Sequence, residues 1–415
     1  MGFLRDPITF IHDWLETVLL NWGVSVEATT VVLTLIGAFV VGTFGLGLVI
    51  FTIWLERKLY ARIQDRFGPN RVGPWGIFQT VPDIIKIFTK EYITPVGADK
   101  FIYNLAPILS VSAVLLTWAV IPFAPTIFGT DVNVGVLYII AVGSMGTLSI
   151  IMAGWSSNNK YSLLGAFRAV AQMVSYEVPM VLALLVPVLL GGTMGINSLV
   201  ASQDVWYVVL APLAALMFFI STMAETGRAP FDLLEAESEL VAGYQTEYSG
   251  LKFGMFYVGE FLHAFTISAL SATLFLGGWR GPWVESTPVL GLVWFFAKTF
   301  LVYFLVVLIR ISMPRLRIDQ MLNFNWKFLT PIGLVLLIIT AVVDKLIYLL
   351  LPELSITIGS TAFIWIRASS HLIANVLIAF VVIGVLRTYQ IKARHTVGKP
   401  RPVAVAPEPP ASVIT

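Results

Sequence analysis

The stretch AETGRAPFDLLEAESELVAGYQTEYSG, residues 224–250, decides how the chain is organised. It is a polar block between two apolar runs that are each long enough to cross a bilayer. Carboxylates held close together raise each other's pKa and can exchange protons near neutral pH. On spacing alone, a solvated loop whose acids face water is the favoured interpretation, since most charge runs are of that kind. The block has one cation, Arg228, and six carboxylates: Glu225, Asp232, Glu235, Glu237, Glu239 and Glu247.

The composition places the whole chain in a membrane. It is 57% hydrophobic and 12% charged, with a mean hydropathy of +0.85, whereas an average soluble domain has about 25% charged residues. Cysteine is absent, which excludes disulfides, a catalytic thiol and thiolate-held iron–sulfur clusters within this chain. The four histidines stand at 12, 263, 371 and 395, and no two have the short spacing typical of a metal or haem site.

The hydropathy predicts an all-α, polytopic bundle of about nine transmembrane helices. A span needs about 20 mostly apolar residues, and nine stretches qualify. Lysine and arginine favour cytoplasmic connections. With the N-terminus outside, all but five cations fall in or next to cytoplasmic connections, so we expect this orientation. The predicted spans are 29–55, 104–124, 136–155, 163–191, 205–225, 253–277, 289–311, 329–351 and 361–387.

Several polar features stand out against these spans. The segment from Thr80 to Glu91 reads as an amphipathic helix on the membrane surface, with Thr80 as its cap. Glu177 lies well inside the fourth predicted span, where an acid is expensive and suggests function. Glu260 and His263 form an i,i+3 pair in the sixth.

Several long blocks together resemble one family, the quinone-site membrane subunit of respiratory complex I. This is the H subunit of bacterial NADH:quinone oxidoreductase, or subunit 1 of the mitochondrial enzyme. The resemblance runs in order from about residue 28 to about 350. Besides the 224–250 block, it is carried by ERKLYARIQDRFGPNRVGP (56–74), PDIIKIFTKE (82–91), SSNNKYSLLGAFRAVAQMVSYE (156–177) and PRLRIDQ (314–320).

The sequence itself predicts an N-terminal interfacial segment (1–27), an extra C-terminal span (352–397) in which the chain departs from the family, and a disordered tail (398–415). The resemblance implies an eight-span family core (28–351). It also implies roles for named residues. Seven would line or support the path and chamber for quinone: Glu56, Arg57, Arg66, Asp83, Lys86, Arg228 and Asp232. Seven would form an acidic path that carries the redox signal, and protons with it: Glu177, Glu225, Glu235, Glu237, Glu239, Glu247 and Glu260.

The implied substrate is a quinone, ubiquinone or menaquinone, and this chain would bind no FMN, haem or iron–sulfur cluster. The implied partners are the peripheral quinone-site and terminal iron–sulfur subunits, the antiporter-like and small membrane subunits, and lipids, with no nucleic acid. The chain would sit in the bacterial inner membrane as an enzyme subunit that lacks a complete active site of its own. Three alternatives remain open: a related energy-converting hydrogenase or other-donor dehydrogenase, a stand-alone ion-coupled transporter, and a structural anchor.

Overall fold

The computed structural model describes residues 7–234, 237–353, 357 and 359–397. Within these ranges the regular structure is helical, apart from one isolated bridge between Ala124 and Ile127. Among the residues that the structure describes, eight helices are long and apolar enough to cross a membrane. The prediction of an all-α polytopic bundle is confirmed, and the chain is an integral membrane protein. The predicted tail, 398–415, lies outside the described residues.

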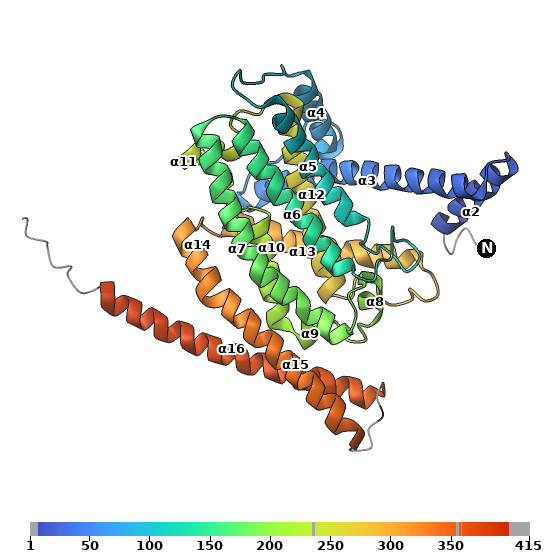
Figure 1. Cartoon of the computed structure of the whole chain (residues 1–415), viewed down its shortest axis with the longest axis vertical. Coiled ribbons are helices and arrows are strands. Elements are labelled where there is room, and N and C mark those ends of the chain that lie inside the picture. The colour runs from blue at the N-terminus through green and yellow to red at the C-terminus, as the bar shows by residue number, and fades with distance from the viewer. Residues whose placement is uncertain (1–6, 235–236, 354–356, 358, 398–415) are drawn as a thin grey trace, which may run out of the picture.

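The N-terminal part consists of α2 (Pro7–Asn21) and a long helix, α3 (Val26–Ile63). Ser25 caps α3 by accepting a hydrogen bond from the Ala28 amide. Figure 1 shows the first half of α3, in blue, extending away from the bundle, while its second half passes into it. The helix therefore brings Glu56, near its end, to the centre of the molecule.

The surface segment that follows differs in detail from the prediction. A 3-10 segment, η1 (Pro74–Gln79), leads directly into α4 (Thr80–Thr89). Gln79 is therefore the N-cap, and the predicted cap, Thr80, is the first helical residue. On α4, Val81, Ile85 and Phe88 are exposed apolar side chains, as expected of an amphipathic helix at a membrane or partner surface.

The bundle itself is built by the longer helices. Asp99 and Asn159 cap α5 and α7 with their side chains. The core-forming helices are α5 (Lys100–Trp118), α6 (Gly135–Ser156), α7 (Lys160–Gly191), α12 (Gly250–Phe275) and α13 (Val289–Ser312). The short elements between them are α8 (Ile196–Ala201), α11 (Glu237–Leu240) and η2 (Gly243–Gln245).

The fifth predicted span, 205–225, is divided into α9 (Tyr207–Leu210) and α10 (Pro212–Glu225). Pro212 has no N–H to donate, and Ala211 adopts φ −132° and ψ 63°, which interrupts the helix. At 1.5 Å per residue, the 14 residues of α10 reach about 21 Å, less than the hydrocarbon thickness of about 30 Å. α10 packs inside the bundle against α7, as Figure 1 shows.

The C-terminal part is a continuous helical run followed by one more helix. The run comprises α14 (Ile318–Phe324), a π-helical turn, η3 (Asn325–Leu329), and α15 (Thr330–Glu353). The last helix, α16 (Thr361–Val397), contacts α15, α9 and α10 and lies along one edge of the bundle in Figure 1.

Candidate functional site

The turn after α10 begins the candidate site. Gly227 has φ +64°, and a Cβ there would lie 1.5 Å from Cδ1 of Leu234, so only glycine fits. The side chain of Gln172 on α7 donates to the Ala224 carbonyl at 2.6 Å and to the Phe231 carbonyl at 2.7 Å. One amide thus holds both ends of the turn, and sequence reasoning missed it.

This turn places Arg228 in the protein interior beside Glu56. The Glu56 carboxylate is 2% exposed and accepts hydrogen bonds from Arg228, from Arg310 at 3.1 Å and from the Tyr303 hydroxyl at 2.6 Å. Glu260 lies 3.5 Å from Arg228 Nε. Two carboxylates and two guanidinium groups therefore meet, and their formal charges balance.

The balance explains how Arg228 stays charged although it is only 1% exposed. Burial opposes its charge, but the attraction of Glu56 is stronger, so the pKa of the guanidinium is raised above its usual value. Its guanidinium also lies over the Phe261 ring, 4.8 Å from the centroid. Arg228 is thus a fixed positive charge at the membrane end of the turn.

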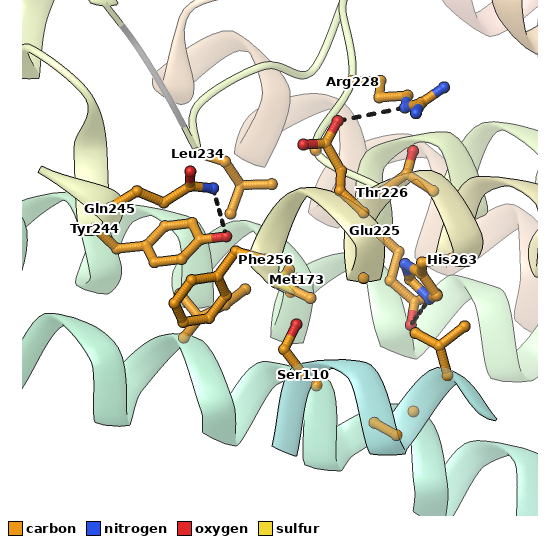
Figure 2. A pocket seen from close by; sticks show the side chains of 18 of the residues that line it. Ser110, Met173, Glu225, Thr226, Arg228, Leu234, Tyr244, Gln245, Phe256 and His263 are labelled. Atoms are coloured by element: carbon orange, nitrogen blue, oxygen red, sulfur yellow. Dashed lines mark hydrogen bonds and ion pairs between the residues drawn. The ribbon is translucent and has the colours of Figure 1, made fainter. Parts of the chain in front are cut away.

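A cavity of about 80 Å³ opens beside this group, between α5, α6, α7, α12 and the turn. Since one water occupies about 30 Å³ in the liquid, the cavity has room for a few waters. Figure 2 shows the Glu225 and His263 side chains directed toward each other in it, with Tyr244 and Phe256 farther along the wall. Its polar lining includes Ser110, Thr117, Glu225, Thr226, Arg228, Asp232, Tyr244, Gln245, Glu260, His263 and Arg310.

A second cavity of about 30 Å³ continues from the first. Glu225 and His263 line both, and Glu225 Oε1 lies 3.9 Å from His263 Nε2. Glu177 lines the second cavity, where most other groups are apolar. The structure therefore brings four predicted acids into one row, which runs from Asp232 and Glu260 through Glu225 to Glu177.

The other acids of the 224–250 block lie elsewhere. Glu239 pairs with Arg168 at 2.6 Å, and Glu247 accepts a hydrogen bond from Asn159 at 2.6 Å. The hydrogen bond from Arg168 and its charge lower the pKa of Glu239. Glu235 lies outside the described residues, as does the side chain of Glu237 on α11. The block is thus not one cluster among the described side chains, and Arg228 neutralises Glu56 and Glu260 instead.

The remaining predicted residues form a separate surface group. Arg57 and Asp83 pair at 2.6 Å between α3 and α4. Arg66 is exposed and donates to Gln64 at 2.8 Å, and Lys86 is exposed on α4. These residues lie apart from the lining of the cavities.

Sequence reasoning missed three members of the site besides Gln172. Tyr303 gives no signal in the sequence, since a tyrosine in an apolar helix is common. Arg310 at the end of α13 resembles an ordinary membrane-edge cation. His263 was recognised beside Glu260 but not as the neighbour of Glu225, which comes from another helix.

Comparison with known proteins shows which family the chain belongs to. A family model described as NADH dehydrogenase matches residues 36–341. The H subunit of the NADH-quinone oxidoreductase of Dehalococcoides mccartyi is 51% identical over 293 residues, which cover 71% of this chain and 82% of that protein. An H subunit of the same oxidoreductase from Geobacter metallireducens is 46% identical, with 71% of this chain and 91% of that protein covered. The one from Bacteroides thetaiotaomicron is 42% identical, with 80% and 96% covered. The chain therefore belongs to the NADH dehydrogenase family.

Proposed function

We propose that this chain is the membrane subunit of a proton-pumping NADH:quinone oxidoreductase, complex I, at the junction of its membrane and peripheral arms. The names of its relatives support the oxidoreductase and its quinone substrate. One observation carries the coupling role: the row of partly buried acids from Asp232 and Glu260 through Glu225 to Glu177, along two cavities that share Glu225 and His263. Such a row offers successive sites for protons and water.

The quinone chamber, in this proposal, lies outside the two cavities, which are too small for a substituted ring. The surface beside α4 fits better, because it combines the polar group Arg57, Asp83, Lys86 and Arg66 with exposed aromatic side chains. Phe67 is 91% exposed and Trp75 is 74% exposed. A peripheral partner covering this surface would complete a chamber for ubiquinone or menaquinone.

The partner would also supply the electrons. This chain has no cysteine to hold an iron–sulfur cluster, so the terminal cluster belongs to a peripheral subunit in this proposal. The proposal assigns the FMN to a peripheral subunit as well. The antiporter-like and small membrane subunits would receive the signal on the other side. The bias of Lys and Arg supports an inner-membrane orientation with the N-terminus outside and the 224–250 block in the cytoplasm. In this orientation α9 and α10, which together cover residues 207–225, cross the membrane as one interrupted span.

Coupling would begin with the change of charge on the quinone. Reduction creates an anionic headgroup that cations such as Arg57 and Arg66 stabilise. The Glu56–Arg228 group links that surface to the row of acids, since Glu56 stands next to Arg57 in the chain and Arg228 lines the cavity. A shift of charge or protonation there changes the proton affinity of Glu260 and Glu225. Glu235 and Glu237 keep the path role that the resemblance implies, whereas Glu239 and Glu247 would hold the loop to α7.

The test is a pair of neutral substitutions in the intact complex, Glu225→Gln and Glu177→Gln. A positioned proton-transfer group contributes about 10²–10⁴-fold, so we expect coupled quinone reduction to fall by at least about tenfold with normal assembly. The control is Glu285→Gln, an exposed acid between α12 and α13. Full NADH-driven turnover and full pumping in both test variants would remove these acids from the mechanism.

Two alternative functions are separable from this one. A complex that uses another electron donor would contain the same row of acids but would show no NADH-driven quinone reduction after purification with its partners. A purely structural anchor would tolerate Glu225→Gln and Glu177→Gln without loss of pumping.

A further inference from the structure

The extra helix α16 has polar side chains on the face that meets the bundle. His371 is 1% exposed and Asn375 is 2% exposed, one turn apart. Arg367, one turn before His371, is also mostly buried, with 17% of its side chain exposed. Buried polar groups in a membrane helix are costly unless they find partners in the protein. The partners of these three show what α16 is attached to.

Arg367 and His371 bind the same carboxylate. Arg367 Nε lies 2.8 Å and His371 Nε2 3.2 Å from Oδ1 of Asp344 on α15. The Arg367 guanidinium also lies over the Tyr348 ring, 5.4 Å from its centroid. Asp344 and Arg367 were unremarkable as single residues in the sequence. Together they form a largely buried ion pair between α15 and α16, with 17% and 14% of the Arg367 and Asp344 side chains exposed.

The same face supplies hydrogen bonds to free carbonyls of the bundle. Arg367 Nη2 donates to the Leu190 carbonyl at 2.8 Å. Leu190 is in the last turn of α7, where the carbonyls accept no hydrogen bond from within the helix. Asn375 Nδ2 donates to Leu210 O at 3.1 Å, the last residue of α9, where Ala211 and Pro212 interrupt the helix. α16 therefore supplies donors to two helix-end carbonyls that would otherwise lack a hydrogen-bond partner in the membrane.

These two ends belong to the segments that carry the central acids. α7 contains Glu177, and α10, which follows the interruption, ends at Glu225. α10 has 14 residues: Asn375 binds the Leu210 carbonyl two residues before its first residue, Pro212, and Glu225 is its last residue. A change in how α9 and α10 join would thus move Glu225 relative to His263.

We propose that α16 is a polar clamp that fixes the junction of α9 and α10, and that Asn375 is a positioning residue for Glu225. This rests on the proposed role of Glu225 in coupling. The clamp holds the helix in the orientation that keeps Glu225 against His263 in both cavities. It gives the ninth span a function within the complex, and not only a place in the bilayer.

The first experiment measures position directly. The chain has no cysteine, so cysteines introduced at Leu216 on α10 and Leu377 on α16, both more than half exposed, can be spin-labelled in the otherwise unlabelled chain of the intact complex. We expect Asn375→Leu to shift or broaden the distance between the labels by about 1–2 Å, the size of helix displacements that interfaces accommodate. Asn375→Gln, which keeps an amide donor, should give the same label distance as the unaltered chain. A distance unchanged by Asn375→Leu overturns the clamp.

The second experiment asks whether Asn375 acts through Glu225. We expect Asn375→Leu to lower protons pumped per NADH by about threefold, within the range of coupling that packed networks carry. The double variant Asn375→Leu/Glu225→Gln should pump as many protons per NADH as Glu225→Gln alone, because each substitution removes the contribution of Glu225. Fully additive losses overturn the positioning role. Ser369→Ala on α16, whose hydroxyl is exposed and bonds only within its helix, is the matched control.

Two outcomes separate this inference from the proposed function. If Glu225→Gln alone leaves pumping unchanged, the coupling role fails, but the label distance still decides the clamp. If Asn375→Leu does not assemble, Asn375→Thr, which is too short to reach Leu210, takes its place in both comparisons. The clamp is then overturned if Asn375→Thr matches the unaltered chain in both measurements.

Discussion

Glu56 and Arg228 are 172 residues apart in the chain, and their side chains form an ion pair in the interior of the bundle. The pair joins the end of α3 to the turn after α10, and Arg310 and Tyr303 of α13 complete it. Because Glu56 stands beside surface Arg57 and Arg228 lines the cavity of acids, this pair connects the two groups of predicted site residues.

Glu56→Gln should be among the most damaging single changes. It leaves Arg228 and Arg310 without their shared carboxylate, and removing one partner of a buried ion pair costs about 3–5 kcal/mol. We expect little assembled complex and a lower melting temperature in detergent. Asp83→Asn, which breaks the exposed pair with Arg57, is the control and should cost about 0–1 kcal/mol. Equal stability of the two variants would contradict the central place given to Glu56.

Gln172→Leu should loosen the turn that carries Arg228. It removes two hydrogen bonds, at about 0.5–1.5 kcal/mol for each, while the Ala224 and Phe231 carbonyls keep their backbone donors Gly227 and Leu233. We expect faster protease cleavage within residues 226–250 of the purified complex. Gln64→Ala, on an exposed residue, should cleave at the original rate. An unchanged cleavage rate in Gln172→Leu would show that other contacts hold the turn.

The sequence was sufficient for the spans but not for the connections between them. Eight of nine predicted spans are confirmed because length and hydropathy are local properties. The remaining one, the fifth predicted span (205–225), was expected to be continuous, but the backbone breaks at Ala211 and Pro212. The groups around Glu56 and Asp344 join residues from distant helices, and no periodicity within one helix reveals such pairs. Glu239 shows the reverse: its place in an acidic block suggested a shared site, yet its partner is Arg168.

The Glu239–Arg168 pair should make the stability of the loop depend on pH in the acidic range. The pKa of folded Glu239 is lowered, so its contribution to stability is present above its unfolded pKa and is lost as pH falls through the folded value. Glu239→Gln should therefore reduce the dependence of loop stability on pH below about 4.3, the ordinary pKa of glutamate, with pumping at neutral pH unchanged. Since the Glu239 side chain is 52% exposed, added salt should have the same effect as the substitution. The measurement is loop proteolysis against pH in both chains; a clear loss of pumping would place Glu239 in the acidic path after all.

The pair of Asp344 and Arg367 predicts a rescue. Asp344→Asn leaves Arg367 as an unpaired cation between α15 and α16, and Arg367→Gln leaves Asp344 with only His371. Each single variant should destabilise the complex by several kcal/mol, because an uncompensated charge in a membrane helix is costly. The double variant removes both charges and should regain most of that loss, since the remaining amides can still hydrogen-bond. Thermal unfolding of the four chains in one detergent forms a double-mutant cycle that measures the interaction. Simple addition of the two losses would mean that the charges act independently, and that α16 is held to α15 by its apolar contacts alone.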